Sequence, residues 1–194
     1  MTAGVSLRRI ASALIALLSL TLAAPANAGI DWASILEGEI LVESATSENG
    51  LEGVRAVFAV TASRERIWEV LTDYENFKNV FPRIEEMIVL EEDGTGATIE
   101  FWGDALVTDL HYVLRRSYVE SGYRLTWRRI SGDLKRIEGS WRIVEGPEPG
   151  VYALVYESFV DVGFAIVTWI VRLGALNEAR NMAARLRAWI EAQP

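Results

Sequence analysis

His111 is the only histidine of the chain, and an imidazole is the side chain best suited to act as a general base near neutral pH. Asp109 lies two residues before it, so both side chains point to the same face of an extended strand. The apolar residues that alternate with them need the buried face, which leaves His111 and Asp109 facing outward. The sequence therefore favours a solvated surface histidine over a catalytic base.

Signals for covalent, metal or cofactor chemistry are missing from the sequence. The chain contains no cysteine, which excludes a disulfide framework, a thiolate metal site and a cysteine nucleophile. The stretch Gly94-Thr95-Gly96 lacks the remaining glycine of a dinucleotide-binding loop, and no nucleophile elbow is present. We therefore predict no catalytic residue, no metal and no cofactor. Proton transfer could use only Tyr112, Tyr156, Thr108 or a carboxylate turned inward.

Large aromatic side chains occupy inward positions of the predicted strands. In a ligand cavity these rings would stack on a lipid ring or polyene, while tyrosine hydroxyls held a polar head. Alternatively, the rings fill the core, and each buries ~150–250 Å² in either case, so burial does not separate the two interpretations. The predicted ligand-binding rings are Phe101, Tyr112, Trp127, Trp141 and Tyr156.

Arg116 shares the inward parity of Tyr112 and Leu114, which is unusual for a charged residue. Either it lies beyond the part of the strand that a helix covers, or it marks a cavity mouth where a carboxylate or phosphate head group docks. We include Arg116 among the predicted ligand-binding residues on the second interpretation.

The run from Val162 to Val171 is almost wholly apolar and includes Trp169, which we also predict to contact ligand. Ten residues are too short to span a bilayer. The part from Phe164 to Val171 could be the buried first turn of a helix, or it could touch a membrane transiently while a lipid enters or leaves. Both interpretations stay open.

A long amphipathic helix and a sheet must position these side chains. Apolar residues recur at helical spacing from Phe164 to Ile190, beside several arginines, so this helix needs an apolar surface to cover. The segment from Gly38 to Val160 supplies one: a first strand, a helix capped by Ser63, a short helix within Asp73 to Pro82, and then consecutive strands. The predicted turns between those strands are Asp93-Gly94-Thr95-Gly96, Gly103-Asp104, Glu120-Ser121-Gly122, Ser131-Gly132-Asp133 and Gly146-Pro147-Glu148-Pro149-Gly150.

Two motifs in this arrangement resemble a known family. The run from Ile67 to Phe77, followed by Phe81-Pro82, is similar to the first-helix signature of the START-like (SRPBCC) superfamily, in its polyketide cyclase/dehydrase and coenzyme-Q-binding branch. The stretch from Gly139 to Ile143 resembles the Gly-x-Trp strand of that branch. The resemblance implies an α+β helix-grip fold, with two short helices after the first main strand. In that fold a curved antiparallel sheet of about seven strands wraps a long C-terminal helix and encloses a hydrophobic cavity.

Residues 1–28 have the pattern of a cleavable export signal. Arg8 and Arg9 precede an apolar stretch from Ile10 to Ala24, and Ala26-Asn27-Ala28 has the small residues of a cleavage site. The apolar stretch is shorter than the ~20 residues of a membrane anchor. We expect an exported protein, soluble in the bacterial periplasm, with a lead-in of residues 29–50 that holds a short strand and a START-like domain of residues 51–194. The route, Sec or twin-arginine, stays open.

Charge and fold together define the predicted function. The formal charge of −8 becomes −10 when the signal with its two arginines is removed, and phosphate binding needs a basic patch, so nucleic acid is excluded as a partner. We predict a binding or carrier protein for a hydrophobic small molecule, such as an isoprenoid, quinone, sterol-like or acyl lipid. An aromatase/cyclase- or dehydrase-like enzyme using the same cavity is the first alternative, and a structural or partner-binding domain with a filled core is the second.

Overall fold

The computed structural model describes residues 29–104, 109–120, 122–163 and 168–192. The export signal predicted for residues 1–28 lies outside these ranges, as do residues 164–167 of the apolar run. The strands are β1 (Ile40–Thr46), β2 (Glu52–Thr61), β3 (Ile84–Asp93), β4 (Gly96–Asp104), β5 (Asp109–Glu120), β6 (Arg124–Gly132), β7 (Arg136–Glu145) and β8 (Val151–Asp161). The helices are α1 (Trp32–Leu36), α2 (Arg64–Thr72), α3 (Phe77–Val80) and α4 (Thr168–Glu191).

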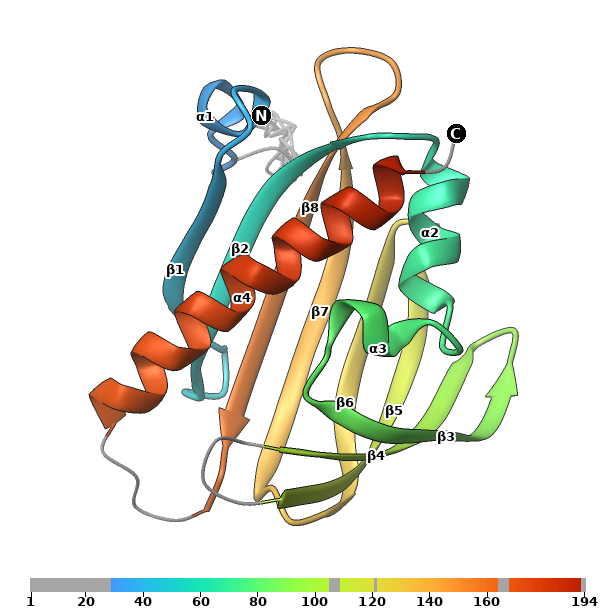
Figure 1. Cartoon of the computed structure of the whole chain (residues 1–194), viewed down its shortest axis with the longest axis vertical. Coiled ribbons are helices and arrows are strands. Elements are labelled where there is room, and N and C mark those ends of the chain that lie inside the picture. Colours follow the sequence, from blue (N-terminus) through green and yellow to red (C-terminus); the bar gives the residue numbers. More distant parts are fainter. Residues whose placement is uncertain (1–28, 105–108, 121, 164–167, 193–194) are drawn as a thin grey trace, which may run out of the picture.

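The strands form one curved sheet in the order β1-β2-β8-β7-β6-β5-β4-β3, and every pair of neighbours is antiparallel. Helix α4 crosses the concave face diagonally, and α2 and α3 lie on the same side of the sheet (Figure 1). This is the α+β helix-grip fold that the sequence predicted. The eighth strand is β1, which the sequence placed in the lead-in as a short strand.

Local signals explain most of the elements. Ser63 accepts a hydrogen bond from the backbone N–H of Arg66 and so caps α2, as expected. The predicted second helix is the single turn α3, which ends just before Pro82. Strands end at four of the five predicted turns. The resulting core joins α2 and α4 to the inner face of the sheet through Ile67, Leu154, Leu186 and Ile190.

The turn predicted at Gly103-Asp104 was wrong. Strand β4 continues through both residues, and Asp104 pairs with Asp109, so Phe101 lies opposite Tyr112. A Cβ atom on Gly103 would lie 2.3 Å from the backbone oxygen of Arg83, which shows that this glycine lets β3 approach closely. The change of register is by an even number of residues, so Phe101 and Tyr112 still share the inner face.

Helix α1 was not predicted, and it covers the outer face of the sheet. Asp31 caps it by accepting a hydrogen bond of 3.2 Å from the backbone N–H of Ser34. Ile35 packs in a second small core with Val57, Val144 and Val155, whose side chains point away from α4. The lead-in is therefore part of the packed structure on both faces of the sheet.

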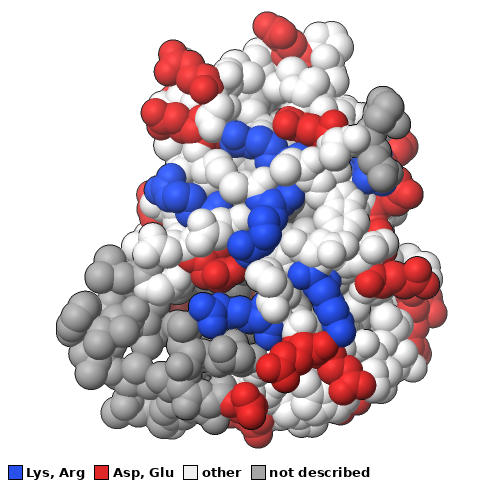
Figure 2. Space-filling view, in the orientation of Figure 1, with Lys and Arg blue, Asp and Glu red and all other residues white. Residues whose placement is uncertain are grey.

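The arginines of α4 fasten the helix to backbone carbonyl groups. Arg180 donates to Ile40 O at 2.8 Å and Arg187 to Gly38 O at 2.7 Å, which ties the helix to the start of β1. Arg185 donates to Val80 O at 2.8 Å and thereby holds α3. Basic side chains are spread over this face although the chain is acidic (Figure 2). These bonds give the arginines a structural role that the sequence pattern did not reveal.

Candidate ligand-binding cleft

A cleft of about 660 Å³ lies between α4 and the strands β1, β2 and β8. Small-molecule sites usually measure ~300–1,000 Å³, so the cleft is large enough for a lipid-sized ligand. Its lining is mainly small or apolar and includes Gly53, Val54, Val160, Ala175, Ala179 and Met182.

The cleft exists because small side chains face each other across it. Ala175 and Ala179 are four residues apart, so both methyl groups lie on one side of α4. Opposite them, Val54 of β2 lines the cleft. Four residues further along α4, Ala183 is fully buried in the main core. The same helix thus borders an open space in one half and a packed core in the other.

Polar groups occupy the edge of this cleft. Glu178 accepts a hydrogen bond of 2.6 Å from Arg185 and also lies 3.9 Å from the guanidinium of Arg83. On the sheet, Tyr156 and Ser158 both line the cleft, and burial raises the pKa of the Tyr156 hydroxyl, an effect that the hydrogen bond with Ser158 opposes. Tyr156 is therefore a neutral phenol at neutral pH and can donate a hydrogen bond to a ligand.

The aromatic residues predicted to bind ligand are all buried or partly buried on the inner face, but they pack on one another. Phe101 stacks on Tyr112 with ring centroids 5.2 Å apart, and Trp127 stacks on Tyr156 at 5.7 Å. Trp141 lies 4.7 Å from the same tyrosine. Of these rings, Tyr156 lines the cleft, and the others lie behind it or further toward β4.

The half of the interior below α2 and α3 is filled. A void of about 10 Å³ remains there, lined by residues that include Leu71, Phe77, Trp141 and Leu186. Such a space holds no more than about one water molecule. The cleft on the β1-β2-β8 side is far larger than this void and is the candidate site.

Arg116 points inward, as predicted, but it lies neither beyond the helices nor at the mouth of the cleft. Its exposed fraction is 3%, and it is covered by residues of the α2–α3 region. Its Nη2 donates to Leu71 O at 3.0 Å, and its guanidinium lies 5.0 Å from the ring centre of Tyr74 and 5.2 Å from that of Phe77. Among the described residues, Nη1 has no hydrogen-bond partner and no carboxylate forms an ion pair with Arg116. Burial lowers the pKa of this guanidinium.

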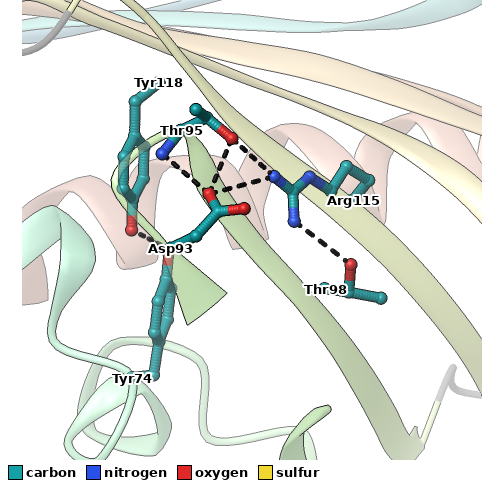
Figure 3. A network of polar contacts seen from close by, with 6 residues as sticks. All are labelled: Tyr74, Asp93, Thr95, Thr98, Arg115 and Tyr118. Atoms are coloured by element: carbon teal, nitrogen blue, oxygen red, sulfur yellow. Dashed lines mark hydrogen bonds and ion pairs between the residues drawn. The ribbon is translucent and has the colours of Figure 1, made fainter. Parts of the chain in front are cut away.

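The neighbouring Arg115 has a different environment, which Figure 3 shows. Its side chain lies on the outer face and donates to Thr98 and Thr95, and it pairs with Asp93 at 3.4 Å. Asp93 also accepts hydrogen bonds from the Thr95 backbone and hydroxyl, which hold the turn between β3 and β4.

Two tyrosines near Arg116 form a hydrogen bond between the α2 region and the sheet. The hydroxyl groups of Tyr74 and Tyr118 lie 2.8 Å apart, which joins the end of α2 to β5 (Figure 3). Burial, together with this hydrogen bond, raises the pKa of Tyr118, and Trp68 packs against its ring at 5.3 Å. This pair was not predicted as part of a site. The one signal in the sequence that could have indicated it is the inward-facing position of Tyr118 on β5.

His111 faces outward, as predicted, with 41% of its side chain exposed. Its Nε2 lies 2.7 Å from Glu100 Oε1, and its ring stacks on Trp102 at 4.9 Å. Its partner is therefore Glu100 across the strand pair. Within the described residues, no group of three or more histidine, cysteine or acidic side chains could hold a metal ion.

Trp169 belongs to α4, but its side chain lies outside the part of the chain that the structure describes. In the same part, no helix is both long and apolar enough to cross a membrane.

Comparison with known proteins identifies the family. The family model described as polyketide cyclase / dehydrase and lipid transport matches residues 60–187, and the chain belongs to this family. It is thus a member of the START-like (SRPBCC) superfamily, as its helix and Gly-x-Trp motifs indicated. A comparison with curated protein sequences gives no significant match.

Solved structures of several bacterial proteins share the fold. A STAR-related lipid transfer protein from Xanthomonas axonopodis has a TM-score of 0.64 at 18% identity, covering 78% of this chain and 93% of its own. A START superfamily protein from Mycobacterium smegmatis gives 0.63 at 17%, covering 72% and 97%. The Zhui aromatase/cyclase from Streptomyces sp. R1128 gives 0.51 at 19%, covering 77% and 87%. At these identities the likeness shows the fold alone.

Proposed function

We propose that this protein binds or carries a hydrophobic small molecule in the cleft between α4 and the strands β1, β2 and β8. The observation that carries the proposal is the cleft itself, which measures about 660 Å³ and has a mainly small or apolar lining, whereas the void under α2 and α3 measures about 10 Å³. An isoprenoid, quinone, sterol-like molecule or acyl lipid has the required apolar surface. The family description, which includes lipid transport, supports the same class of ligand.

Apolar burial would supply most of the affinity. Each methylene group transferred from water into the cleft contributes ~0.8 kcal/mol, so an acyl or isoprenoid tail needs few polar contacts. Tyr156 and Ser158 offer hydroxyl groups to a polar end of the ligand. The rings of Trp127 and Trp141 pack against Tyr156, and Phe101 stacks on Tyr112 on the same inner face of the sheet.

Uptake would occur at Phe164 to Val171, where Trp169 would meet the ligand and a membrane surface transiently.

Mass spectrometry of the mature protein, purified without detergent, tests this function. We expect organic extraction to release a lipid-sized molecule from the protein. When the extracted protein is analysed again, this molecule should be absent. A matched variant, Ala175→Phe, narrows the cleft and should carry less of the molecule. The proposal fails if neither the protein as isolated nor the delipidated protein offered hexadecanol binds an apolar molecule.

We further propose that the protein is exported to the periplasm and does not bind nucleic acid. Support comes from the signal pattern of residues 1–28 and from the acidic net charge. Expression of the full chain in a Gram-negative host should yield periplasmic protein that begins at Gly29. Protein that stays in the cytoplasm with its first residues intact would contradict the export proposal.

An aromatase/cyclase- or dehydrase-like enzyme is the second candidate, favoured by the first part of the family description. Its proton-transfer groups would be the hydroxyls of Tyr112 and Tyr156, whose pKa burial raises, or the carboxylates of Glu178 and Asp161, which line the cleft. The only histidine is on the outer face and cannot serve the cleft. Loss of turnover of a polyketide substrate in Tyr156→Phe, with ligand binding retained, would favour this candidate over a carrier.

A further inference from the structure

Phe81 is the one described residue that lines both the open cleft and the void in the filled half. It follows α3 directly and borders the cleft of about 660 Å³ and the void of about 10 Å³. On α4 the same boundary falls within about one turn, because Met182 lines the cleft and Leu186 lines the void. Four residues correspond to ~6 Å along a helix, so the two spaces lie close together. Phe81 therefore forms part of the wall between them.

Two packed rings of the sheet complete this wall. Tyr156 lines the cleft and Trp141 lines the void, and their ring centroids lie 4.7 Å apart. Trp141 is 2% exposed and also packs edge-on against Phe58. Its ring is thus fixed between strands, whereas Phe81 lies in the short connection between α3 and β3. Phe81 is therefore the part of the wall whose size can change without rebuilding the sheet.

Several contacts hold Phe81 in this position. Its ring stacks on that of Phe77, with the ring centroids 4.5 Å apart. The carbonyl group of Val80, the preceding residue, accepts a hydrogen bond of 2.8 Å from Arg185 of α4. Arg185 also donates to Glu178, which lines the cleft. The wall is thus anchored to the helix that borders both spaces, and an apolar chain in the cleft meets a ring that is held in place.

We propose that Phe81 ends the cleft on its α3 side and thereby sets the longest apolar chain that the protein binds along its full length. This inference rests on the proposed function and adds a chain-length limit to its ligand class. Each methylene group that leaves water for an apolar space strengthens binding ~fourfold, but only while space remains. Beyond the limit, further methylene groups stay in water, because the void behind Phe81 holds no more than about one water molecule.

Straight-chain primary alcohols from decanol to octadecanol, offered to the delipidated mature protein, test the inference. In the unaltered protein, affinity should rise ~fourfold per methylene group up to a limiting length and then stay level. In Phe81→Ala the phenyl ring is gone and the void joins the cleft, so the limiting length should increase by at least about two methylene groups. Alcohols below the original limit should bind within about threefold of their original affinity. Displacement of a fluorescent fatty alcohol measures each affinity.

Leu186→Ala is the matched control, because Leu186 lines the void but not the cleft. The change enlarges the void behind an intact Phe81, so the limiting length should stay the same. Val70→Ala, which also alters the lining of the void alone, serves if this control does not fold. Phe81→Leu keeps an apolar side chain of intermediate size and should lengthen the limit by about one methylene group. It takes the place of Phe81→Ala if the alanine variant does not fold.

The outcomes separate this inference from the proposed function. Equal limiting lengths in the unaltered protein and the Phe81 variants would overturn the role of Phe81 and leave the apolar cleft standing. The same conclusion would follow if affinity for the unaltered protein rose through the whole series, or if Leu186→Ala lengthened the limit as much as Phe81→Ala. Failure of every alcohol to bind would overturn the proposed function, and the inference with it.

Discussion

The two halves of the concave face differ in how they are filled, although one sheet and one helix build both. Below α2, α3 and the C-terminal half of α4, Leu71, Trp141 and Leu186 line a void of about 10 Å³. On the β1-β2-β8 side, the preceding part of α4 borders a cleft of about 660 Å³. Both halves are predominantly apolar, so their polarity does not distinguish them. They differ in the size of the side chains that face each other across the interior.

This difference shows how a small domain can have a close-packed core and still keep an open cleft. The filled half supplies the close-packed contacts on which folding depends. The open half keeps alanine on α4 where a larger residue would close the space. A substitution should therefore affect stability in the filled half and ligand binding in the open half, and the following predictions test that division.

The largest effect is expected when a buried side chain of the filled half is removed. Leu186→Ala should lower the free energy of unfolding by ~2–5 kcal/mol, because Leu186 is 2% exposed and lines only a water-sized void. Val160→Ala is the matched change beside the cleft, where the side chain is 38% exposed, and should cost below ~1 kcal/mol. Urea unfolding of both variants measures the difference, and equal losses would remove the distinction between the halves.

The next effect comes from adding the same ring at two positions of one helix. Ala183→Phe should destabilise the protein by ~1–3 kcal/mol or more, because Ala183 is completely buried in the filled half. Ala175→Phe should change stability by less than ~1 kcal/mol, since its ring enters the cleft, but should weaken hexadecanol binding at least about tenfold. Thermal unfolding and a hexadecanol titration of both variants check this. Tolerance of the ring at both positions would show that the core is not tightly packed.

A smaller effect concerns the pH dependence of the aromatic wall. Burial raises the pKa of Tyr112 from its ordinary value of 10.0 to about 12. The folded protein therefore keeps this proton when the unfolded chain loses it, so stability is full below pH 10 and falls as the pH rises toward 12. Between pH 9 and 11.5 the unaltered protein should lose about 2 kcal/mol more than Tyr112→Phe. If urea unfolding shows the same loss of unfolding free energy in both proteins over this pH range, the Tyr112 hydroxyl is in contact with water.

The smallest effect is expected on the outer face. His111→Gln should change stability by less than ~1 kcal/mol, because the pair with Glu100 is partly exposed, at 41% and 22% of the side chains. Hexadecanol affinity should not change, since the residue lies on the far side of the sheet from the cleft. A loss of binding or of any catalytic turnover in this variant would mean that the outer face takes part in function.

Much of the fold could be predicted from the sequence because alternation and turn residues act locally. The inward set Phe101, Tyr112, Trp127, Trp141 and Tyr156 followed from parity alone, and the structure places all of them on that face. The assignment of side chains to the inner face also held despite the wrong turn at Gly103, because a change of register by an even number of residues keeps each side chain on the same face. Helix α1 was missed because five residues are too few to establish a helical period.

The position of the open space could not be predicted in the same way. A parity argument shows which residues face inward, but not how far apart the two walls lie. The rings that were expected to line a cavity mostly pack on each other, and the cleft is bordered on α4 by Ala175 and Ala179, small residues that carry no recognisable ligand signal. The crowding of Trp127 over Gly139 likewise depends on contacts between strands distant in sequence.

The central claim is that an apolar ligand occupies the cleft beside α4 and leaves the filled half undisturbed. A nitroxide-labelled C16 lipid added to the isotope-labelled mature protein tests it most directly by NMR. We expect strong broadening of the methyl signals of Met182, Ala179 and Val54, which line the cleft, and weak broadening of Ile99 and Leu125 in the filled half. Strong broadening at Ile99 and Leu125 with sharp signals from Met182 would contradict the account.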